Sequence, residues 1–275
     1  MKLKEFFPSA LKMARLKLLD PMRLNQSSAQ DLPVIVSCTS IPSRFHVLNI
    51  TIRSVLNQTR PPKKIILWLH ERHKGKLPDS LLSVEGKKFE IRFTDLDSPH
   101  CKLVPTLLSH PTETIVTCDD DLIYDPEWLE RLWLDHETNP NYIIANRCNL
   151  ISYDTDGNTL PYRQWVKDVP AGTISPAIMP AGYGGVIYPP GSLNSDVTNH
   201  ELYLTLSPKA DDLWFKAMSY LNGTLCKKAS IPGQRPMPII GSKKITLSRV
   251  NIKEDQNREQ WNAIRAHYKF RTPDA

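Results

Sequence analysis

The sequence predicts an α/β protein whose central sheet is mainly parallel and flanked by helices. Short apolar runs of strand length recur between residues 33 and 118, and helical material separates them. The four expected strands are Val34–Thr39, Lys64–Leu69, Phe89–Phe93 and Thr114–Cys118. Strands that alternate with helices are typical of a parallel sheet. Such strands are buried on both faces, so continuous apolar runs are expected rather than alternation.

Apolar residues at helical spacing place helices between and after these strands. The expected helices are Val47–Leu56, Leu77–Val84, Leu103–Leu108, Glu127–His136 and Ala210–Leu221, and Tyr142–Ala145 is a further strand candidate. Residues 150–208 are rich in Pro, Gly and Tyr and show little periodicity. A long irregular segment inside a compact domain is typical of a functional loop system.

The composition is that of a globular protein large enough to bury a core. The chain has 275 residues, of which 40% are hydrophobic and 23% charged. It contains no apolar run long enough to cross a bilayer, and its N-terminus lacks the pattern of a secretory signal. The five cysteines are widely spaced and form no C-x-x-C pair, which favours buried, reduced thiols in a cytosolic protein.

The net charge of +6 is concentrated at the N-terminus. Residues 1–25 carry six basic and two acidic residues, hence +4, which leaves +2 for the other 250 residues. A nearly neutral body argues against nucleic acid as a partner. Residues 8–19 predict a helix, stopped by Asp20-Pro21, whose apolar face consists of Leu3, Phe7, Ala10, Leu11, Ala14 and Leu18. This helix either contacts an anionic membrane through residues 1–20 or packs on the domain or on a partner.

Three regions follow from this pattern. Residues 1–31 form the basic amphipathic helix and a linker at 22–31, residues 32–248 form one catalytic-type domain, and residues 249–275 form a C-terminal helical tail.

The most informative polar cluster is Asp119-Asp120-Asp121, which directly follows the fourth expected strand. Ligands of open parallel sheets bind outside the carboxyl ends of the strands. Three adjacent carboxylates repel one another unless a divalent cation neutralises them, and their hard oxygens suit Mg²⁺ or Mn²⁺. The alternative is a solvated turn that caps the next helix. The similar Asp154-Thr155-Asp156 is interpreted as a hairpin turn, because Gly157-Asn158 follows it.

Two further segments carry chemistry. Asp211 and Asp212 begin an amphipathic helix, where they either compensate the helix dipole or include a general base. The glycine-rich segment 181–185 precedes an apolar run, and its glycines allow close approach of backbone to a ligand or simply form a turn.

These motifs together resemble the bacterial GT-A-fold glycosyltransferases, most closely the glycosyltransferase family 2-like group. The resemblance covers Pro33 to Leu221 and rests on VIVSCTSIPSR, TIVTCDDDLIYDPEWL, GYGGVIYPP and ADDLWFKAM. It implies a single-domain, Rossmann-like GT-A fold. The acid triplet is similar to the family's D-x-D motif, and Asp211-Asp212 to its E-D motif with Asp in place of Glu.

The resemblance also implies roles for particular residues. The residues expected to bind the donor are Thr39, Ser40, Arg44, Asp97, Lys102, Asp119 and Asp120. Asp121, together with Asp119, is expected to hold the metal, and Gly184 and Gly185 to form an acceptor-side loop. Asp212 is the expected general base, with Asp211 as the other catalytic acid, because consecutive helical positions point about 100° apart and only one can face the acceptor.

The resulting functional prediction is a Mn²⁺- or Mg²⁺-dependent, inverting glycosyltransferase. It would move a sugar from a nucleotide-sugar donor, such as a UDP-sugar, to a glycan or lipid-linked acceptor in bacterial capsule or lipopolysaccharide synthesis. The expected location is cytoplasmic, at the inner face of the plasma membrane. Two alternatives stay open. One is a nucleotidyltransferase acting on sugar phosphates, against which the loop CTSIPSR, with one Arg and no Gly, argues. The other is a non-catalytic protein that binds an anionic polymer or a membrane.

Overall fold

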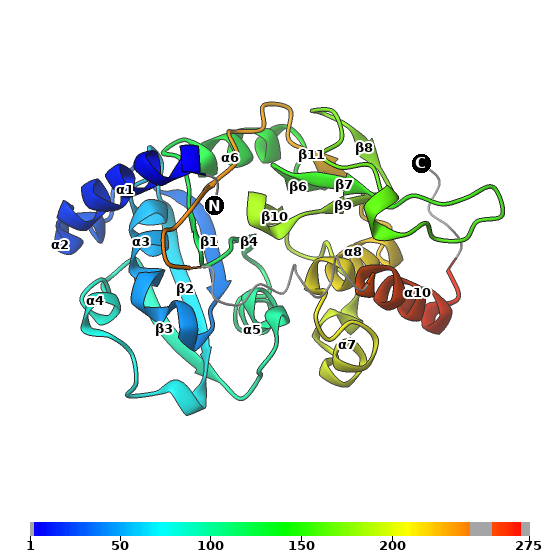
Figure 1. Ribbon diagram of the computed structural model, residues 1–275, viewed down its shortest axis with the longest axis horizontal. Helices are drawn as coiled ribbons and strands as arrows, with labels where there is room; N and C mark the ends of the chain where they lie inside the picture. Colours follow the sequence, from blue (N-terminus) through cyan, green and yellow to red (C-terminus); the bar gives the residue numbers. More distant parts are fainter. Residues whose placement is uncertain (1–2, 243–254, 271–275) are drawn as a thin grey trace.

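The structure is a computed structural model, and it describes residues 3–242 and 255–270. Its centre is an eight-stranded sheet in the order β3-β2-β1-β4-β10-β6-β11-β8 (Figure 1). The strands are β1 (Leu32–Thr39), β2 (Pro62–His70), β3 (Phe89–Thr94), β4 (Thr114–Thr117), β6 (Ile143–Ala145), β8 (Ile174–Ser175), β10 (Val186–Tyr188) and β11 (Cys226–Lys228). Strands β1 to β4 pair in parallel, β6 pairs in parallel with β11, and β8 and β10 run antiparallel to their neighbours. The predicted single-domain α/β fold with a mainly parallel sheet is confirmed.

The predicted helices and strands of the first half are all present with shifted ends. The helices are α3 (Phe45–Leu56), α4 (Asp79–Leu82), α5 (Val104–Ser109), α6 (Trp128–Thr138) and α8 (Asp211–Leu221). Strand β1 begins two residues earlier than expected, because Leu32 pairs with Pro62 and its backbone N–H donates to the Pro61 carbonyl. Helices α3 and α6 contribute to one buried core on the sheet, which includes Leu48, Ile52 and Leu132.

Residues 150–208 contain more structure than their sequence predicts. They hold β8, β9 (Ile178–Pro180), β10 and α7 (His200–Leu206), and β9 pairs with β7 (Cys148–Leu150). Because these strands have only two or three residues, no periodicity marks them in the sequence. The predicted hairpin turn is confirmed. Tyr153 bridges Thr159, and the Asp154 carboxylate accepts the N–H groups of Asp156 and Asn158.

A second buried core lies on the other face of the sheet, because β4, β6 and β10 send alternate residues to the two cores. It includes residues of α7, α8 and α10 (Gln256–Tyr268), and α10 contributes Trp261 and Ile264. Figure 1 shows α10 beside α8 and α7 at one end of the molecule. The predicted tail at 249–275 therefore has a helix that belongs to the main core, while its other residues lie partly outside the described ranges. All five cysteines are buried and free, as predicted.

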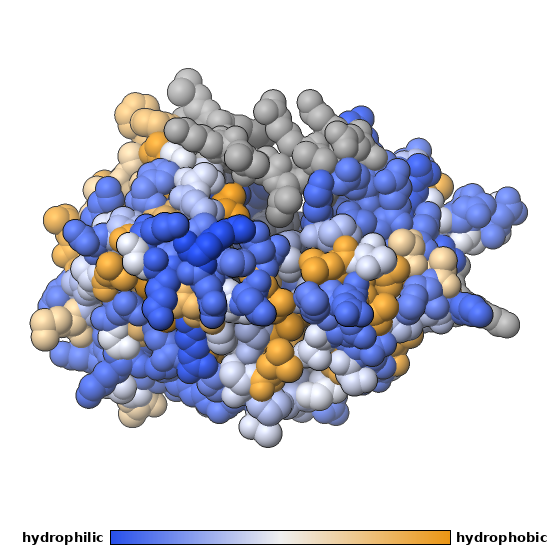
Figure 2. Space-filling model, turned by 90° about the horizontal axis from the view of Figure 1, so that it is seen from below, coloured by the Kyte–Doolittle hydropathy of each residue, from blue (hydrophilic) through white to orange (hydrophobic). Residues whose placement is uncertain are grey.

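Helix α1 (Leu3–Leu18) packs against α3 and β12 (Met237–Pro238), and β12 pairs with β5 (Leu122–Ile123). The predicted linker at 22–31 is partly wrong, since Pro21–Leu24 forms α2. Pro21 takes the first helical position, and the Asp20 side chain accepts the Met22 N–H as its cap. Among the described residues, no helix is long and apolar enough to cross a membrane. The surface seen in Figure 2 is mostly hydrophilic, with hydrophobic residues in small separate patches.

Candidate functional site

The carboxyl ends of β1 and β4 place Asp120 at the start of helix α3. Because β1 and β4 are parallel neighbours, the residues that follow them meet at the same edge of the sheet. The Asp120 carboxylate accepts the Ser40 hydroxyl at 2.5 Å and the Arg44 guanidinium at 2.5 Å, and its side chain is only 6% exposed. Arg44 also contacts Asp121 at 3.1 Å. Asp120 therefore connects the two strand ends, a role that leaves it poorly placed to bind a ligand directly.

These two acids govern the pKa of Arg44. Burial by itself would lower this pKa, but the charges of Asp120 and Asp121 outweigh the burial and raise it. The guanidinium is therefore a permanent cation at the end of β1.

Lys102 forms the centre of a second cluster of charges. It ends a 3₁₀ turn, Pro99–Lys102, that follows β3. Its Nζ lies 2.6 Å from Asp211 Oδ2, 3.2 Å from Asp212 Oδ1 and 3.8 Å from Asp119 Oδ1. Burial would lower the pKa of Lys102, but these three carboxylates raise it well above its ordinary value. Three carboxylates from two separate parts of the chain therefore share one buried cation.

This geometry corrects the prediction for the acid pair of α8. Only one of Asp211 and Asp212 was expected to face the site, yet both carboxylates contact the same Lys102 Nζ. Both residues lie in the first turn of the helix. At a helix end, neighbouring short side chains can contact the same group. The assignment of Asp212 as the base stays a prediction.

Two of these carboxyl groups bind protons unusually tightly. Burial is the main cause that raises the pKa of Asp119 to about 7 and that of Asp211 to about 6, and neighbouring acids add to it against the opposing charge of Lys102. Near neutral pH the cluster therefore exchanges protons easily. Perturbed carboxyl groups of this kind gather at functional sites more often than elsewhere.

The glycine segment contacts the Lys102 cluster at a residue that the sequence analysis did not select. The Gly182 N–H donates to Asp212 Oδ2 at 3.0 Å. A Cβ atom on Gly182 would collide with Lys102 Nζ and lie 2.8 Å from Asp212 Oδ1. A larger residue at position 182 would therefore have to displace the ends of the Lys102 and Asp212 side chains. The segment Ala181–Gly185 signalled a close approach, but nothing in the sequence showed which glycine makes it.

Gly184 and Gly185, the residues predicted for an acceptor-side loop, pack against the protein instead. The Gly184 carbonyl accepts Trp128 Nε1–H at 2.8 Å and the Asn146 side-chain amide at 3.1 Å. Gly185 has a φ of +90°, and a Cβ there would lie 2.5 Å from the Trp128 ring. The absence of a side chain lets Gly184 approach Arg147 and Gly185 approach Trp128 of α6, and an acceptor-side role for both glycines stays a prediction.

Tyr124 is a further positioning residue that sequence reasoning missed. Its hydroxyl accepts the Asp119 N–H at 2.9 Å and donates to the Tyr183 carbonyl at 3.3 Å. It therefore ties the acid triplet to the glycine segment. In the sequence, Tyr124 is distinguished only by its place five residues after Asp119, which does not predict these two hydrogen bonds.

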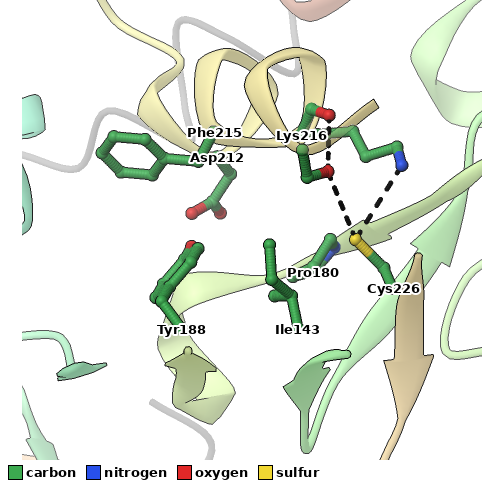
Figure 3. Close-up of a pocket in the computed structure, with 8 residues that line it drawn as sticks. Ile143, Pro180, Tyr188, Asp212, Phe215, Lys216 and Cys226 are labelled. Atoms are coloured by element: carbon green, nitrogen blue, oxygen red, sulfur yellow. Dashed lines mark hydrogen bonds between the residues drawn. The ribbon is translucent and has the colours of Figure 1, made fainter. Parts of the chain in front are cut away.

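The space behind Asp212 is closely packed. Figure 3 shows Asp212 beside Tyr188, with Ile143 and Phe215 in the same wall. Lys216 points away from Asp212 in this view, and its Nζ lies 3.8 Å from Cys226 Sγ. The Asp212 side chain therefore contacts Lys102 on one side and closely packed, mostly apolar residues on the other.

Two predicted donor-binding residues have other partners. The Thr39 hydroxyl donates to the Trp68 carbonyl at 2.9 Å, within the β1–β2 pair. Asp97 forms an exposed ion pair with Arg72. The strand-end cluster thus consists of Ser40, Arg44, Lys102, Asp119, Asp120, Asp121, Asp211 and Asp212.

Asp119 and Asp121, the residues predicted to hold a divalent cation, both belong to this cluster. Within residues 3–242 and 255–270, no group of three or more His, Cys, Asp or Glu side chains is arranged to hold a metal by itself. Asp119 and Asp121 nevertheless supply two hard carboxylates, and their side chains are 34% and 18% exposed. Mg²⁺ is commonly held by one or two carboxylates with substrate phosphates completing its shell. The predicted metal role of Asp119 and Asp121 is therefore kept as a proposal.

The raised pKa of Asp119 predicts a pH-dependent affinity for Mn²⁺. A carboxyl group must lose its proton to bind a cation, so Mn²⁺ affinity should rise by about tenfold per pH unit until the pH reaches the pKa of Asp119, and then level off. Calorimetric titration in buffers of different ionisation enthalpy measures the proton released. The variant Asp119→Asn should bind Mn²⁺ weakly and without this pH dependence. An affinity of the native protein that is flat between about pH 5 and 7 contradicts the assignment.

No protein-family model and no curated protein matches this chain. Solved structures of similar fold include a CMP:2-keto-3-deoxy-manno-octonic acid synthetase complexed with CTP, at 12% identity and a TM-score of 0.43, covering 82% of this chain and 99% of the other. Another is a 4-diphosphocytidyl-2C-methyl-D-erythritol synthase from Anaerococcus prevotii, at 15% identity and a TM-score of 0.45, covering 89% of this chain and 100% of the other.

These comparisons do not support the main functional prediction. Both neighbours are named as synthases of products that carry a cytidine nucleotide, which is nucleotidyl transfer and not glycosyl transfer. The prediction of a glycosyltransferase finds no support in these comparisons and is set aside, and membership of the glycosyltransferase family 2-like group is not confirmed. An acid cluster after a strand suits any reaction that handles a metal-bound diphosphate at this edge of the sheet, so it does not by itself identify glycosyl transfer. At these identities the similarity concerns the fold alone.

Proposed function

We propose that this protein is a divalent-metal-dependent nucleotidyltransferase that joins a nucleoside triphosphate to a sugar phosphate. The observation that carries the proposal is the presence of two cations, Arg44 and Lys102, from different elements within one cluster of strand-end carboxylates. The loop after β1 supplies only one Arg, which argued against this function. The turn after β3 supplies the second cation, so the scarcity of basic residues in that loop no longer counts against it.

Charge balance supports a role for a metal in this reaction. Arg44 and Lys102 face five carboxylates, Asp119, Asp120, Asp121, Asp211 and Asp212, which gives a formal sum of −3 when all are ionised. A triphosphate would be repelled by such a cluster. A divalent cation at Asp119 and Asp121 would supply charge neutralisation for the triphosphate and the leaving pyrophosphate.

The chain's own residues would position the substrates and neutralise the charge of the phosphates. An oxygen of the sugar phosphate attacks the α-phosphorus, and the bond from that phosphorus to the bridging oxygen breaks, which releases pyrophosphate. An ionised phosphate oxygen has no proton to lose, so this step needs no general base. Asp211 and Asp212 would hold Lys102 beside the phosphates, and Asp120 would hold Arg44.

The test is pyrophosphate release by the full chain from nucleoside triphosphates offered with a panel of sugar phosphates, with and without Mg²⁺ or Mn²⁺. Asp119→Asn and Asp121→Asn should each reduce turnover by about 10²-fold or more, since a catalytic cation contributes several kcal/mol. The matched control is Asp156→Asn, the same change in an exposed turn, which should keep full activity. Release that needs no divalent cation, or undiminished turnover in both variants, would rule out the proposed role of the acids.

A further inference from the structure

Helix α1 presents an apolar stripe to solvent. Phe7 is 77% exposed, Leu11 54% and Leu18 86%. Met22 continues the stripe on α2 (Pro21–Leu24) and is 79% exposed. At about 100° per residue, positions 7, 11, 14 and 18 lie within about 60° of one another around the helix. Single exposed apolar residues are ordinary, but a continuous row along one helix face is typical of an interaction surface.

The fold holds this stripe outward. The opposite side of α1 is buried through Ser9 and Leu16. The Ser9 hydroxyl donates to the Pro238 carbonyl at 2.8 Å, and the Arg53 guanidinium donates to the carbonyls of Leu16 at 3.3 Å and Leu19 at 2.5 Å. Because these contacts fix the rotation of α1 on α3, the stripe cannot turn into the core. The face that the sequence predicts as apolar is therefore the outer one.

Basic residues flank the stripe on both sides. Arg15 and Lys17 are exposed and lie about 70° and 90° to either side of the centre of the stripe, and Arg23 is exposed on α2. An apolar row between two rows of cations matches the surface of an anionic bilayer, where acyl chains lie beneath negative headgroups. A second copy of the same face would bring like charges together, which disfavours self-association through it.

We propose that the outer face of α1 and α2, defined by Phe7, Leu11, Leu18 and Met22 with Arg15, Lys17 and Arg23, docks the protein on an anionic membrane. The apolar side chains enter the interface and the cations contact the headgroups. Figure 1 shows α1 and α2 along the outside of α3, at one end of the molecule. Docking requires no rearrangement of the core and does not depend on the proposed catalytic activity.

Cosedimentation with vesicles tests the charge part of the proposal. The full chain should bind phosphatidylcholine vesicles that contain phosphatidylglycerol, bind pure phosphatidylcholine weakly, and lose affinity as salt is added. Arg15→Gln with Lys17→Gln should weaken binding by about 30-fold, since each cation near an anionic surface contributes about fivefold. The control Lys74→Gln with Lys76→Gln makes the same change of charge at exposed positions elsewhere and should bind like the native protein.

The apolar part is tested by Phe7→Ser, Leu11→Ser and Leu18→Ser combined. All three side chains are more than half exposed, so the thermal unfolding of the variant should match that of the native protein, while vesicle binding falls by about tenfold or more. The control is Leu108→Ser with Ile231→Ser, at side chains that are 63% and 75% exposed elsewhere. Equal binding by the triple variant overturns the proposal. So does a native protein that ignores phosphatidylglycerol, or one that dimerises through this face without binding vesicles.

Discussion

Replacing Lys102 by methionine is expected to lower the free energy of unfolding by about 3 kcal/mol and to abolish activity. The change leaves Asp119, Asp211 and Asp212 without the cation that they share. Removing one partner of a buried ion pair costs about 3 to 5 kcal/mol. The lower end applies here, because the side chains of Asp119 and Asp212 are about a third exposed and solvent screens part of their repulsion.

The loss should depend on pH in a defined direction. In the native fold the pKa of Asp119 is about 7 and that of Asp211 about 6, both above their unfolded values, and removal of Lys102 raises them further. Groups with a raised folded pKa favour folding at low pH and disfavour it as the pH rises. The destabilisation of the variant should therefore be largest above about pH 7 and shrink as the acids take up protons.

Lys88→Met is the matched control for this prediction. Lys88 is at least as buried as Lys102, but its Nζ pairs with the Asp31 carboxylate at 2.6 Å, at the far end of β3. Its loss should be destabilising with a weaker dependence on pH, and activity should survive in the folded fraction. Urea unfolding of both variants at about pH 5.5 and pH 8, beside turnover, makes the comparison. A loss for Lys102→Met that is the same at both values of pH contradicts the shared-cation interpretation.

Gly182→Ala is expected to reduce turnover by about 10²-fold while lowering the free energy of unfolding by only about 1 to 3 kcal/mol. The new Cβ would collide with Lys102 Nζ, which is the flexible end of a side chain and can move. Its movement separates Lys102 from Asp212 and shifts the cation away from the phosphate position. A displacement of about 1 Å in a positioned charge is enough for a loss of this size.

Gly86→Ala is the control that separates a loss of stability caused by steric collision from a loss of turnover. A Cβ on Gly86 would lie 2.5 Å from Asn25 Cγ, so the substitution makes a similar collision with a side chain, at the other end of the sheet from the acid cluster. It should destabilise the protein and leave the turnover of the folded protein unchanged. The melting temperature and the turnover of both variants show whether Gly182→Ala affects activity beyond its effect on stability. If Gly182→Ala loses stability alone, as Gly86→Ala should, Lys102 is not held in position by Gly182 for catalysis.

The sequence predicted the first half of the sheet because β1 and β2 carry continuous apolar runs and β3 carries apolar residues at Phe89, Ile91 and Phe93, with helices between the strands. The buried middle of β1 and β2 leaves a pattern that can be read without the structure, whereas β3 lies at the edge of the sheet and only its Phe89 is fully buried. Strands β8 and β10 leave no such pattern, since two or three residues cannot show a period. Their place in the sheet depends on pairing with strands that are distant in sequence.

The candidate site divides in the same way. Asp119, Asp120 and Asp121 could be found from the sequence because their residue type and their place after a strand are both local features. The same applies to the acids that begin α8. The sequence could not predict that Ser40 and Arg44 would bind the Asp120 carboxylate. Nor could it predict that Asp211 and Asp212 would both contact Lys102. Those contacts join parts of the chain that only the tertiary fold brings together.

Helix α1 shows most clearly which features the sequence determines and which features the tertiary structure determines. Its sequence determined an amphipathic helix with basic flanks, because residue spacing alone defines the faces of a helix. Which face lies inward was decided by the fold. Ser9 and Leu16 fit the surface formed by α3 and β12, and Arg53 binds the carbonyls at the end of α1, so the apolar face at Phe7, Leu11 and Leu18 points to solvent. The physical reason is that periodicity reports the sides of a helix, whereas complementary packing and hydrogen-bond partners elsewhere in the chain select the side that is buried.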